Sequence, residues 1–326
     1  MSIADSNPSF DENINLGSVT FNDSYIDTHI DLILKLPFID SESIKRRKFK
    51  VVVDAVNSTG GIAIPKLLEK LGVETIKLYC DPTGEFPHNP EPLKENLSDL
   101  SKLVVSQAAD LGIVVDPDVD RLAFVSEDGE VFGEEYTLVA CADYYLKYNP
   151  GNTVSNLSSS RALKDVSDLN GCNHFFSAVG EVNVVELMKK KNAVIGGEGN
   201  GGIILPDLHY GRDALVGIAL FLSHLANLNI SCSQLRSKYP SYFMSKDKIM
   251  LDKTVNVEKI INEFSKKYSD QEINNEDGLK IDFENSWVQL RKSNTEPIIR
   301  VYSEAKSQEE ANELSSKFID EINTVK

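Results

Sequence analysis

The sequence predicts an α/β protein, with two similar αβ domains built on mixed, largely parallel sheets and a small α+β domain at the C-terminus. Apolar runs of strand length alternate with stretches of helical period as far as Pro240, which favours sheets with helical crossovers. After Tyr242 the order changes to strand, helix, several strands and helix, which is typical of a two-layer α+β unit. A length of 326 residues is enough for two or three domains of ordinary size.

The change of pattern along the chain also predicts where the domains begin and end. The first two dozen residues have no clear hydrophobic period, so we interpret them as a tail or linker. The expected divisions are a tail or linker over 1–24, αβ domains over 25–148 and 149–240, and an α+β domain over 241–326.

The first αβ unit begins with an amphipathic stretch, Tyr25–Leu36, which ends before Pro37 and predicts a helix. The β-branched run Val51–Val53 predicts a strand, and the turn-forming residues of Asn57–Gly61 end it. Further patterns predict, in order, a helix over Ile62–Leu71, strands over Glu74–Tyr79 and Leu111–Val115, a hairpin of Leu122–Val125 with Val131–Phe132 around Asp128-Gly129, and a helix over Glu135–Tyr148.

The second unit has the same strand–turn–helix layout, which suggests an internal repeat. The apolar run Ala214–Leu225 is too short for a membrane span and is broken by Ser223 and His224, so it predicts a buried helix. The strand patterns of this unit lie near Thr153–Leu157, His174–Ala178, Ala193–Ile195 and Ile203–Leu205, and the helices expected in the third unit cover Val257–Tyr268 and Gln308–Asn323.

Composition and charge argue against several classes of protein. A net charge of -16 argues against a nucleic-acid partner, because such binding depends on a basic surface. No apolar run suggests a membrane span, and Met1–Asn15 lacks the basic start and apolar run of a secretory signal. The four cysteines are at least 31 residues apart and the histidines have no regularly spaced partners. This favours reduced thiols in a cytoplasmic protein over a disulfide framework or a zinc site.

Three aspartates at alternate positions follow the apolar strand Leu111–Val115 directly. They are Asp116, Asp118 and Asp120, and Arg121 comes next. Alternate side chains of an extended chain point the same way, and carboxylates crowded so closely repel each other unless a cation lies among them. Mg²⁺ is the usual partner of carboxylates combined with phosphate. The motif therefore indicates a magnesium site, and the alternative is an acidic surface loop.

A glycine-rich segment, Gly196–Gly202, lies between two apolar strands. Its five glycines would let the backbone come close to a ligand, while Glu198 and Asn200 supply an acceptor and a donor–acceptor pair for adjacent sugar hydroxyls. No helix begins immediately after it, so it is not a dinucleotide-binding fingerprint. The alternative is a glycine-rich hairpin that binds no ligand.

A basic cluster, Arg291–Pro297 followed by Arg300, is the local source of positive charge that a phosphate ligand requires in an acidic chain. Its cations, hydroxyls, amide and turn backbone N–H groups suit a phosphate group. The alternative is a solvated turn with a rim arginine. Three further segments are candidates for rigid loops at the mouth of a cleft, and the alternative for each is a purely structural role: Gly84–Pro92, Ala178–Glu181 and Gly211–Asp213.

In this order, the three segments resemble the motifs of the α-D-phosphohexomutase superfamily, which includes phosphoglucomutase, phosphomannomutase and phosphoglucosamine mutase. Members of that family have a metal loop of the form DxDxDR, a sugar loop of the form GExSGx and a phosphate loop of the form RxSxTEP. The resemblance extends from Tyr25 to the C-terminus. It implies four domains, with a catalytic phosphoserine in the first, and this chain would correspond to domains two to four.

The resemblance also implies a mechanism and roles for individual residues. Mg²⁺ would be bound by the three loop aspartates together with the serine phosphate, and the phosphoryl group would pass to a hexose phosphate substrate through a hexose bisphosphate, the activating intermediate. The implied site residues are Asp116, Asp118 and Asp120 for the metal, Arg121 beside the transferring phosphoryl group, Gly180, Glu181, Glu198 and Asn200 for the sugar, and Arg291, Ser293, Asn294 and Thr295 for the non-reacting phosphate.

The chain departs from the family pattern at three points. Val119 stands where many members have glycine, and Gly202 stands where many have histidine. The serine motif, typically Ser-His-Asn-Pro, is absent, and its nearest counterpart has Pro87 in place of the serine. We therefore expect that the phosphoserine domain is a missing partner and that the chain alone is inactive.

The function expected is that of a magnesium-dependent phosphohexose mutase, an isomerase that moves a phosphoryl group between the 1- and 6-positions of a hexose phosphate. The alternative is a non-catalytic protein that binds sugar phosphates with the same loops. A phosphatase with an aspartate nucleophile fits less well, because the aspartates are explained as metal ligands and no second acidic cluster completes such a site. The sequence leaves open which hexose is used.

Overall fold

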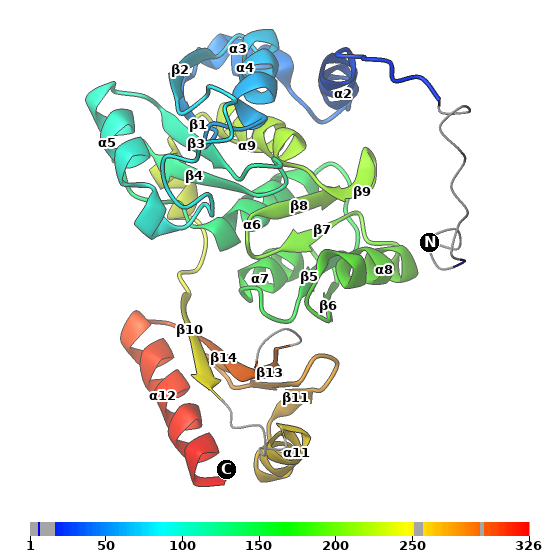
Figure 1. The fold of residues 1–326 in the computed structure, drawn as a ribbon, viewed down its shortest axis with the longest axis vertical. Helices are drawn as coiled ribbons and strands as arrows, with labels where there is room; N and C mark the ends of the chain where they lie inside the picture. The colour runs from blue at the N-terminus through cyan, green and yellow to red at the C-terminus, as the bar shows by residue number, and fades with distance from the viewer. Residues whose placement is uncertain (1–5, 7–16, 251–256, 294–296, 326) are drawn as a thin grey trace.

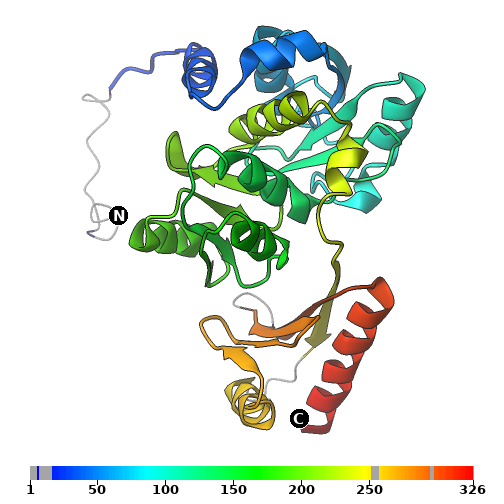
Figure 2. The same cartoon turned by 180° about the vertical axis from the view of Figure 1, so that it is seen from behind.

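The structure is a computed structural model that describes residue 6 and residues 17–250, 257–293 and 297–325. Three sheets follow one another along the described chain, two in the upper body of the molecule and one in a separate lower domain (Figure 1). A single extended connection joins the body to the lower domain (Figures 1 and 2). The predicted fold class is confirmed, whereas the predicted boundaries at 148 and 240 remain a proposal.

The first sheet has the strand order β2-β1-β3-β4, in which β1 is parallel to β2 and β3 and the last strand is antiparallel. Apolar residues alternate across it, so that Val51 and Val53 face one core cluster and Val52 faces another. The elements of this unit are α2 (Tyr25–Leu34), α3 (Ser41–Arg47), β1 (Lys50–Asp54), α4 (Gly60–Lys70), β2 (Glu74–Leu78), η1 (Lys94–Asn96), α5 (Ser98–Ser106), β3 (Leu111–Val115), β4 (Leu122–Ser126) and α6 (Glu134–Tyr145).

The second sheet repeats this topology, with the order β6-β5-β7-β8 and the same strand directions, and adds β9 at one edge. The internal repeat inferred from the layout is therefore present at the level of topology. The elements are β5 (Thr153–Asn156), α7 (Ala162–Leu169), β6 (His174–Ser177), α8 (Glu181–Lys191), β7 (Ile195–Glu198), β8 (Gly202–Leu205), β9 (His209–Arg212), α9 (Ala214–Leu228) and α10 (Cys232–Arg236).

The two αβ units share one apolar core. Helix α9 is buried along its first three turns, as its apolar sequence predicted, and it lies with α6 between the two sheets. A single cluster of buried residues therefore includes Ile113 from the first sheet and Ile203 from the second. This continuous core fixes the loops of one sheet relative to those of the other.

The C-terminal domain is a fully antiparallel sheet, β10-β14-β13-β12-β11, with two helices on one face. Ile249, Leu290 and Val301 face these helices and form a separate core. The elements are β10 (Phe243–Met250), α11 (Val257–Lys267), β11 (Glu272–Asn274), β12 (Leu279–Asp282), β13 (Trp287–Lys292), β14 (Ile298–Ala305) and α12 (Gln308–Val325).

Hydrogen bonds from one arginine hold the C-terminal domain against the second αβ unit. Arg161, directly before α7, donates from Nη2 to Asp282 Oδ1 at 3.1 Å and to the Ser286 carbonyl at 3.0 Å. The buried Lys280 reaches back and donates to the Leu157 carbonyl at 3.0 Å. These bonds position the polar face of the third sheet opposite the loops of the second.

Several local expectations differ from the structure. The strand expected near Ala193–Ile195 lies instead over Ile195–Glu198, so the first glycines of the glycine-rich segment belong to β7. The turn at Asp128-Gly129 forms, but Val131 pairs with Val125 only as an isolated bridge, so the predicted hairpin has no second strand. Helix α6 ends at Tyr145, three residues before the predicted end. No helix in the described part of the chain is long and apolar enough to cross a membrane.

Candidate functional site

The metal loop, residues 116–121, begins where β3 ends at the carboxyl edge of the first sheet. The turn after β1 holds it in place, because Ser58 Oγ and Thr59 Oγ1 both donate to the Pro117 carbonyl, at 2.6 and 2.9 Å. Strands β1 and β3 are parallel neighbours, so their carboxyl ends meet at this edge. The loop is thus fixed by a part of the chain nearly 60 residues away.

The three aspartates predicted as metal ligands lie together. Their carboxylate oxygens are within 4.8 Å of one another. Asp116 is buried, and its Oδ1 accepts hydrogen bonds from the backbone N–H groups of Asp120 and Arg121 at 3.1 and 3.0 Å. Asp120 Oδ1 is buried and has no hydrogen-bond partner. A set of hard oxygen donors, one of them unsatisfied, fits a hard divalent cation such as Mg²⁺.

The electrostatics of the loop also favour a cation. The pKa of Asp116 is raised to about 7, mainly because the carboxyl is buried; the backbone hydrogen bond from Arg121 opposes this rise, and the neighbouring carboxylates of Asp120 and Asp118 add to it. A cation among these carboxylates would stabilise the ionised form of Asp116, which burial and the neighbouring negative charges disfavour. The residues present therefore fit the metal that the sequence predicted.

Val119, in the middle of the metal loop, has a positive φ of 63°. This left-handed conformation is strained for a β-branched residue and favours glycine. The chain is held there by a hydrogen bond from the Ala214 backbone N–H to the Val119 carbonyl at 3.1 Å. A valine at this position, where many family members have glycine, therefore strains the backbone. The hydrogen bond with the second αβ unit offsets this strain.

The sugar loop lies at the carboxyl end of β7, in the second sheet. Glu198 Oε1 accepts hydrogen bonds from Asn156 Nδ2 at 2.8 Å and from the Gly180 backbone N–H at 3.2 Å. Asn200 Oδ1 accepts from the Gly202 backbone N–H at 3.2 Å. Gly180 and Glu181 begin helix α8 beside this loop, so the predicted sugar-binding residues come together.

The glycines of the sugar loop were expected to let a ligand come close to the backbone. At two of them, other residues of the protein come close instead. A Cβ on Gly201, which has φ +90°, would lie 2.2 Å from the Leu122 carbonyl oxygen. A Cβ on Gly199 would lie 1.9 Å from a carboxylate oxygen of Glu135. The Leu122 backbone N–H also donates to the Gly201 carbonyl at 3.1 Å. Gly201 thus brings the sugar loop against β4, the strand that follows the metal loop, and Gly199 brings it against the start of α6.

Arg212 links the two loops, and its role was not predicted. Its Nη2 bonds to Asp120 Oδ2, its Nη1 bonds to Glu198 Oε2 at 2.8 Å, and its Nε lies 3.5 Å from Glu181 Oε2. Burial alone would lower the pKa of Arg212, but the three carboxylates raise it overall. The guanidinium therefore remains charged and couples the metal loop to the sugar loop.

The phosphate loop lies between β13 and β14, and the structure describes part of it. Arg291 forms an ion pair from Nε to Asp277 Oδ2 at 2.7 Å, and the same oxygen accepts the Val179 backbone N–H at 3.0 Å. Ser293 is buried, and its backbone N–H donates to the Ile298 carbonyl. The predicted Asn294 and Thr295 lie outside the described residues.

A row of cations crosses the sheet beside this loop. Arg300 is the register partner of Arg291 on one side and of Lys248 on the other, so the three side chains share a face. Like charges placed directly opposite each other are destabilising unless an anion lies between them. Lys246 and Arg300 line the cavity described next, so this is the polar face of the sheet.

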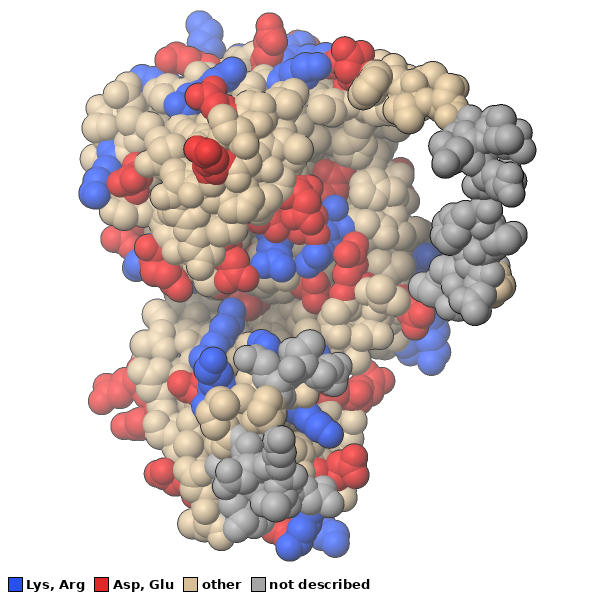
Figure 3. Space-filling view, in the orientation of Figure 1, with Lys and Arg blue, Asp and Glu red and all other residues tan. Residues whose placement is uncertain are grey.

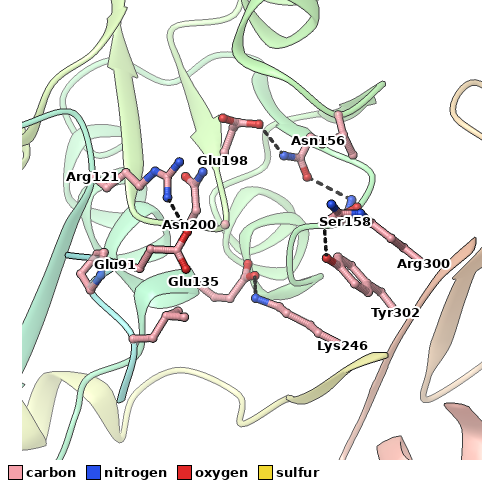
Figure 4. A pocket seen from close by; sticks show the side chains of 14 residues that line it. Glu91, Arg121, Glu135, Asn156, Ser158, Glu198, Asn200, Lys246, Arg300 and Tyr302 are labelled. Atoms are coloured by element: carbon pink, nitrogen blue, oxygen red, sulfur yellow. Dashed lines mark hydrogen bonds and ion pairs between the residues drawn. The ribbon is translucent and has the colours of Figure 1, made fainter. Parts of the chain in front are cut away.

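A cavity of about 360 Å³ joins these parts of the molecule. Arg121 enters it from the metal loop, Glu198 and Asn200 from the sugar loop, and Arg300 from the C-terminal sheet (Figure 4). The molecule is hollowed between the body and the C-terminal domain, and acidic and basic side chains gather at its rim (Figure 3). Arg291 is not among the lining residues and connects to the cavity wall through Asp277 and Val179.

Glu135 also lines the cavity and was not predicted as a site residue. Its Oε2 accepts the Ser160 backbone N–H at 2.8 Å, and its Oε1 lies 3.8 Å from Lys246 Nζ. Burial raises the pKa of Glu135 to about 8, against the opposing charge of Lys246. The sequence placed this residue at the start of a helix and gave no signal that the helix begins at a cavity.

Comparisons with known proteins agree with this geometry. Three family models match in sequence: the alpha/beta/alpha domain II of phosphoglucomutase/phosphomannomutase at residues 24–129, domain III at 133–242 and the C-terminal domain at 248–321. The chain belongs to the phosphoglucomutase/phosphomannomutase family. This confirms the resemblance seen in the sequence.

Individual family members show how much of the molecule is shared. A phosphoglucomutase/phosphomannomutase of Thermococcus kodakarensis is 37% identical over 290 residues, which cover 87% of this chain and 63% of the relative. The crystal structure of a family member from Burkholderia thailandensis superposes with a TM-score of 0.78 at 27% identity and covers 90% of this chain and 63% of that one. The chain therefore spans 63% of the length of either protein.

A more distant structure shares the fold alone. The N-acetylphosphoglucosamine mutase of Aspergillus fumigatus, solved in complex with GlcNAc-6P and magnesium, has a TM-score of 0.62 at 14% identity and covers 91% of this chain and 69% of that one. For this member of the family, the roles of the individual site residues stay predictions. The structure brings the three predicted metal ligands together and joins them to Glu198 through Arg212. Arg291 lies outside the cavity lining and reaches it through Asp277.

Asp118→Asn is expected to weaken Mg²⁺ binding at least tenfold, which is about 1.4 kcal/mol. The substitution removes one of the three carboxylates of the cluster. Asp118 is exposed, so the free energy of unfolding should change by less than about 0.5 kcal/mol. Calorimetric titration with Mg²⁺ and a denaturation curve measure the two quantities. Asp320→Asn, which removes the same charge from the exposed face of α12, is the control. Equal Mg²⁺ affinity of the Asp118 variant and the wild type would count against the assignment.

Proposed function

We propose that this chain forms the metal-binding, sugar-binding and phosphate-binding parts of a magnesium-dependent phosphohexose mutase. The observation that supports it best is a cavity lined by Arg121 of the metal loop, by Glu198 and Asn200 of the sugar loop, and by cations of the C-terminal sheet. A phosphorylated hexose has two kinds of group to be recognised, hydroxyls and a phosphate. The cavity offers carboxylate and amide groups on one wall and cations on another.

The roles proposed for the residues follow from their chemistry. Asp116, Asp118 and Asp120 would hold Mg²⁺, which when bound would neutralise charge on the phosphoryl group. Arg121, whose side chain enters the cavity beside them, would stabilise the phosphoryl group in transfer. The proposed sugar ligands are Glu198 and Asn200 with Gly180 and Glu181 beside them, and the proposed phosphate ligands are Arg291, Ser293, Asn294 and Thr295.

Phosphoryl transfer within a hexose phosphate also needs a group that carries the phosphoryl between positions. In the family pattern this group is a serine in a Ser-His-Asn-Pro segment, and no such segment occurs in the 326 residues. We propose that a phosphoserine domain outside this sequence supplies it, with a hexose bisphosphate as the intermediate, and that the chain alone does not turn over. The binding groups described above position the substrate for that transfer.

The second candidate function is a non-catalytic protein that binds sugar phosphates through the same cavity. Nothing in the binding geometry separates the two, because both need the same contacts. The two functions differ in turnover after a phosphoserine domain is added. The enzyme gains turnover, and the non-catalytic binding protein does not.

Arg291→Ala is expected to weaken binding of glucose 6-phosphate or glucose 1-phosphate by about 1.5–3 kcal/mol, the range for hydrogen bonds to charged groups. The variant removes one cation of the row and frees Asp277, which lies at the edge of the site. Isothermal titration with each sugar phosphate in the presence of Mg²⁺ measures the loss. Arg46→Ala, an exposed arginine on α3, is the matched control. Unchanged affinity of the Arg291 variant would remove this loop from the proposed site.

A further inference from the structure

Two histidines and an aspartate meet next to Arg212, and none of the three lines the cavity. His29 Nε2 lies 2.7 Å from Asp213 Oδ2, and His209 Nε2 lies 3.1 Å from the same oxygen. All three potential ligand atoms are within 4.8 Å of one another. His29 comes from helix α2, His209 from strand β9 and Asp213 from the N-terminus of helix α9, so the cluster joins three elements.

The carboxylate at the centre of the cluster is fixed by the backbone. Asp213 is buried, and its Oδ1 accepts the N–H groups of Leu215 and Val216 at 2.8 and 3.2 Å. Its Oδ2 is left for the two imidazoles. Hydrogen bonding of a ligand from its far side is the usual way in which protein metal ligands are oriented. The carboxylate is thus held with one oxygen aimed at both histidines.

We propose that His29, His209 and Asp213 form a second metal site that binds a borderline transition-metal ion, with Zn²⁺ as the best match, separate from the aspartate loop for Mg²⁺. Two imidazole nitrogens and one carboxylate oxygen form a donor set that suits Zn²⁺ and the neighbouring first-row metals, whereas Mg²⁺ prefers oxygen donors.

The geometry needs little adjustment. Tetrahedral zinc with bonds of about 2.0–2.1 Å places its ligand atoms about 3.3 Å apart. The two nitrogen–oxygen distances, 2.7 and 3.1 Å, are slightly shorter than this. Small outward movements of the two rings would admit the ion, and both side chains can move because they are 31% and 43% exposed. The same exposure provides a path for the ion and room for water as a fourth ligand.

The arrangement without metal is a pair of hydrogen bonds to one carboxylate. Asp213 Oδ2 can accept both only if each imidazole carries its proton on Nε2. Zn²⁺ would take the place of those two protons and bind the same three atoms. The proposal therefore differs from a purely structural cluster in a measurable way, since zinc binding would require both histidines at once.

The sequence pattern did not reveal this site. His209 and Asp213 are four residues apart, but His29 lies 184 residues from Asp213 along the chain. The histidines therefore lack regular spacing, and only the packing of α2 beside α9 brings the third ligand into place. An ion bound there would tie the first helix of the first αβ unit to the second αβ unit.

The test is a titration of the 326-residue chain with Zn²⁺ against a chromophoric chelator, in excess Mg²⁺ so that the aspartate loop is occupied. We expect one equivalent to bind with a dissociation constant below about 10 µM. His29→Gln and His209→Gln should each weaken binding at least about 100-fold, because loss of an outer partner alone costs about 10–100-fold. Co²⁺ should give a visible absorption band of low-coordinate cobalt in the wild type and in neither variant.

Matched controls separate this site from other ligands. His88→Gln removes an imidazole that also contacts a carboxylate, Asp54, at 3.0 Å, but has no second imidazole, so Zn²⁺ binding should be unchanged. Cys80→Ser removes the least buried of the four cysteines and should also leave binding unchanged. Asp213→Asn is avoided, because it would disturb the start of α9.

Two results would overturn the proposal. One is a wild-type chain that binds no Zn²⁺ at micromolar concentration. The other is equal Zn²⁺ affinity in His29→Gln, His209→Gln and the wild type. Circular dichroism and the Tm of each metal-free variant show whether it is folded, and both histidines are exposed enough that we expect folded proteins. Zn²⁺ should also raise the Tm of the wild type, but not that of His29→Gln or His209→Gln.

Discussion

Arg212→Met is expected to lower the free energy of unfolding by about 3 kcal/mol and to abolish measurable binding of hexose phosphates. Arg212 is 14% exposed and holds Asp120, Glu198 and Glu181 in one network. Without it, Glu198 remains buried and loses the cation that lies 2.8 Å from its carboxylate. We place the loss at the low end of the range for a broken buried ion pair, because Glu181 is about one-third exposed.

Urea denaturation measures the stability loss, and isothermal titration measures binding. Arg212→Lys keeps the charge but not the planar guanidinium, whose three nitrogens each lie near a different carboxylate. The losses of stability and of binding should therefore be intermediate. The double variant Arg212→Met, Glu198→Gln removes the uncompensated carboxylate and should recover part of the stability. Arg46→Met, at an exposed position, should change stability by less than about 0.5 kcal/mol. A loss below about 1 kcal/mol in Arg212→Met would contradict the bridging role.

The grouping of Asp116, Asp118 and Asp120 could be predicted because the three carboxylates lie within five consecutive residues. Local spacing there determines spatial proximity, and the structure places the oxygens within 4.8 Å. Arg212 could not be predicted in the same way. Its partners lie 92, 31 and 14 residues away, and they meet it only after α9 packs between the two sheets.

The cation row illustrates a second limit of sequence reasoning. Arg291 and Arg300 were both recognised as a basic cluster, but Lys248 was not, because it lies on a different strand. The three share a face only through the register of β10, β14 and β13. Strand register depends on the fit of the whole apolar face against α11 and α12, and a local motif does not encode it.

The fold class was predictable for a different reason. Strands and helices of the αβ units have apolar periods strong enough to show in a single sequence, and the two units repeat one strand order. The shared core was not predicted, since it depends on how α6 and α9 pack between two sheets. The glycine-rich loop was interpreted as room for a ligand, and in the structure Gly199 and Gly201 make room for Glu135 and Leu122. Glycines in a sequence thus indicate that some group comes close to the backbone, but they do not show whether that group belongs to a ligand or to the protein.

The chain alone is not expected to act as a hexose phosphate mutase. Any turnover rate should lie at least about a thousandfold below the usual enzyme range of about 1–1,000 per second. In the proposed function, the cavity would supply substrate contacts and the aspartate loop would hold Mg²⁺, and together they would position a phosphoryl group. Positioning without a phosphoryl carrier gives no transfer between the 1- and 6-positions. A coupled assay with glucose 1-phosphate, Mg²⁺ and glucose 1,6-bisphosphate measures turnover of the purified chain.

Addition of a separately expressed domain that carries a phosphorylated Ser-His-Asn-Pro segment should restore turnover by at least about a thousandfold, because it provides the missing carrier. The matched control is the same domain with the serine replaced by alanine, which should restore none. Asp118→Asn in this chain should lower the restored rate, since the metal would help to neutralise the transferring phosphoryl group. Enzyme-like turnover by the chain alone would overturn this proposal and point to a replacement nucleophile within it. Binding of the sugar phosphate that never leads to turnover, with a domain shown to be phosphorylated and to associate with the chain, would instead support the non-catalytic sugar-phosphate-binding protein.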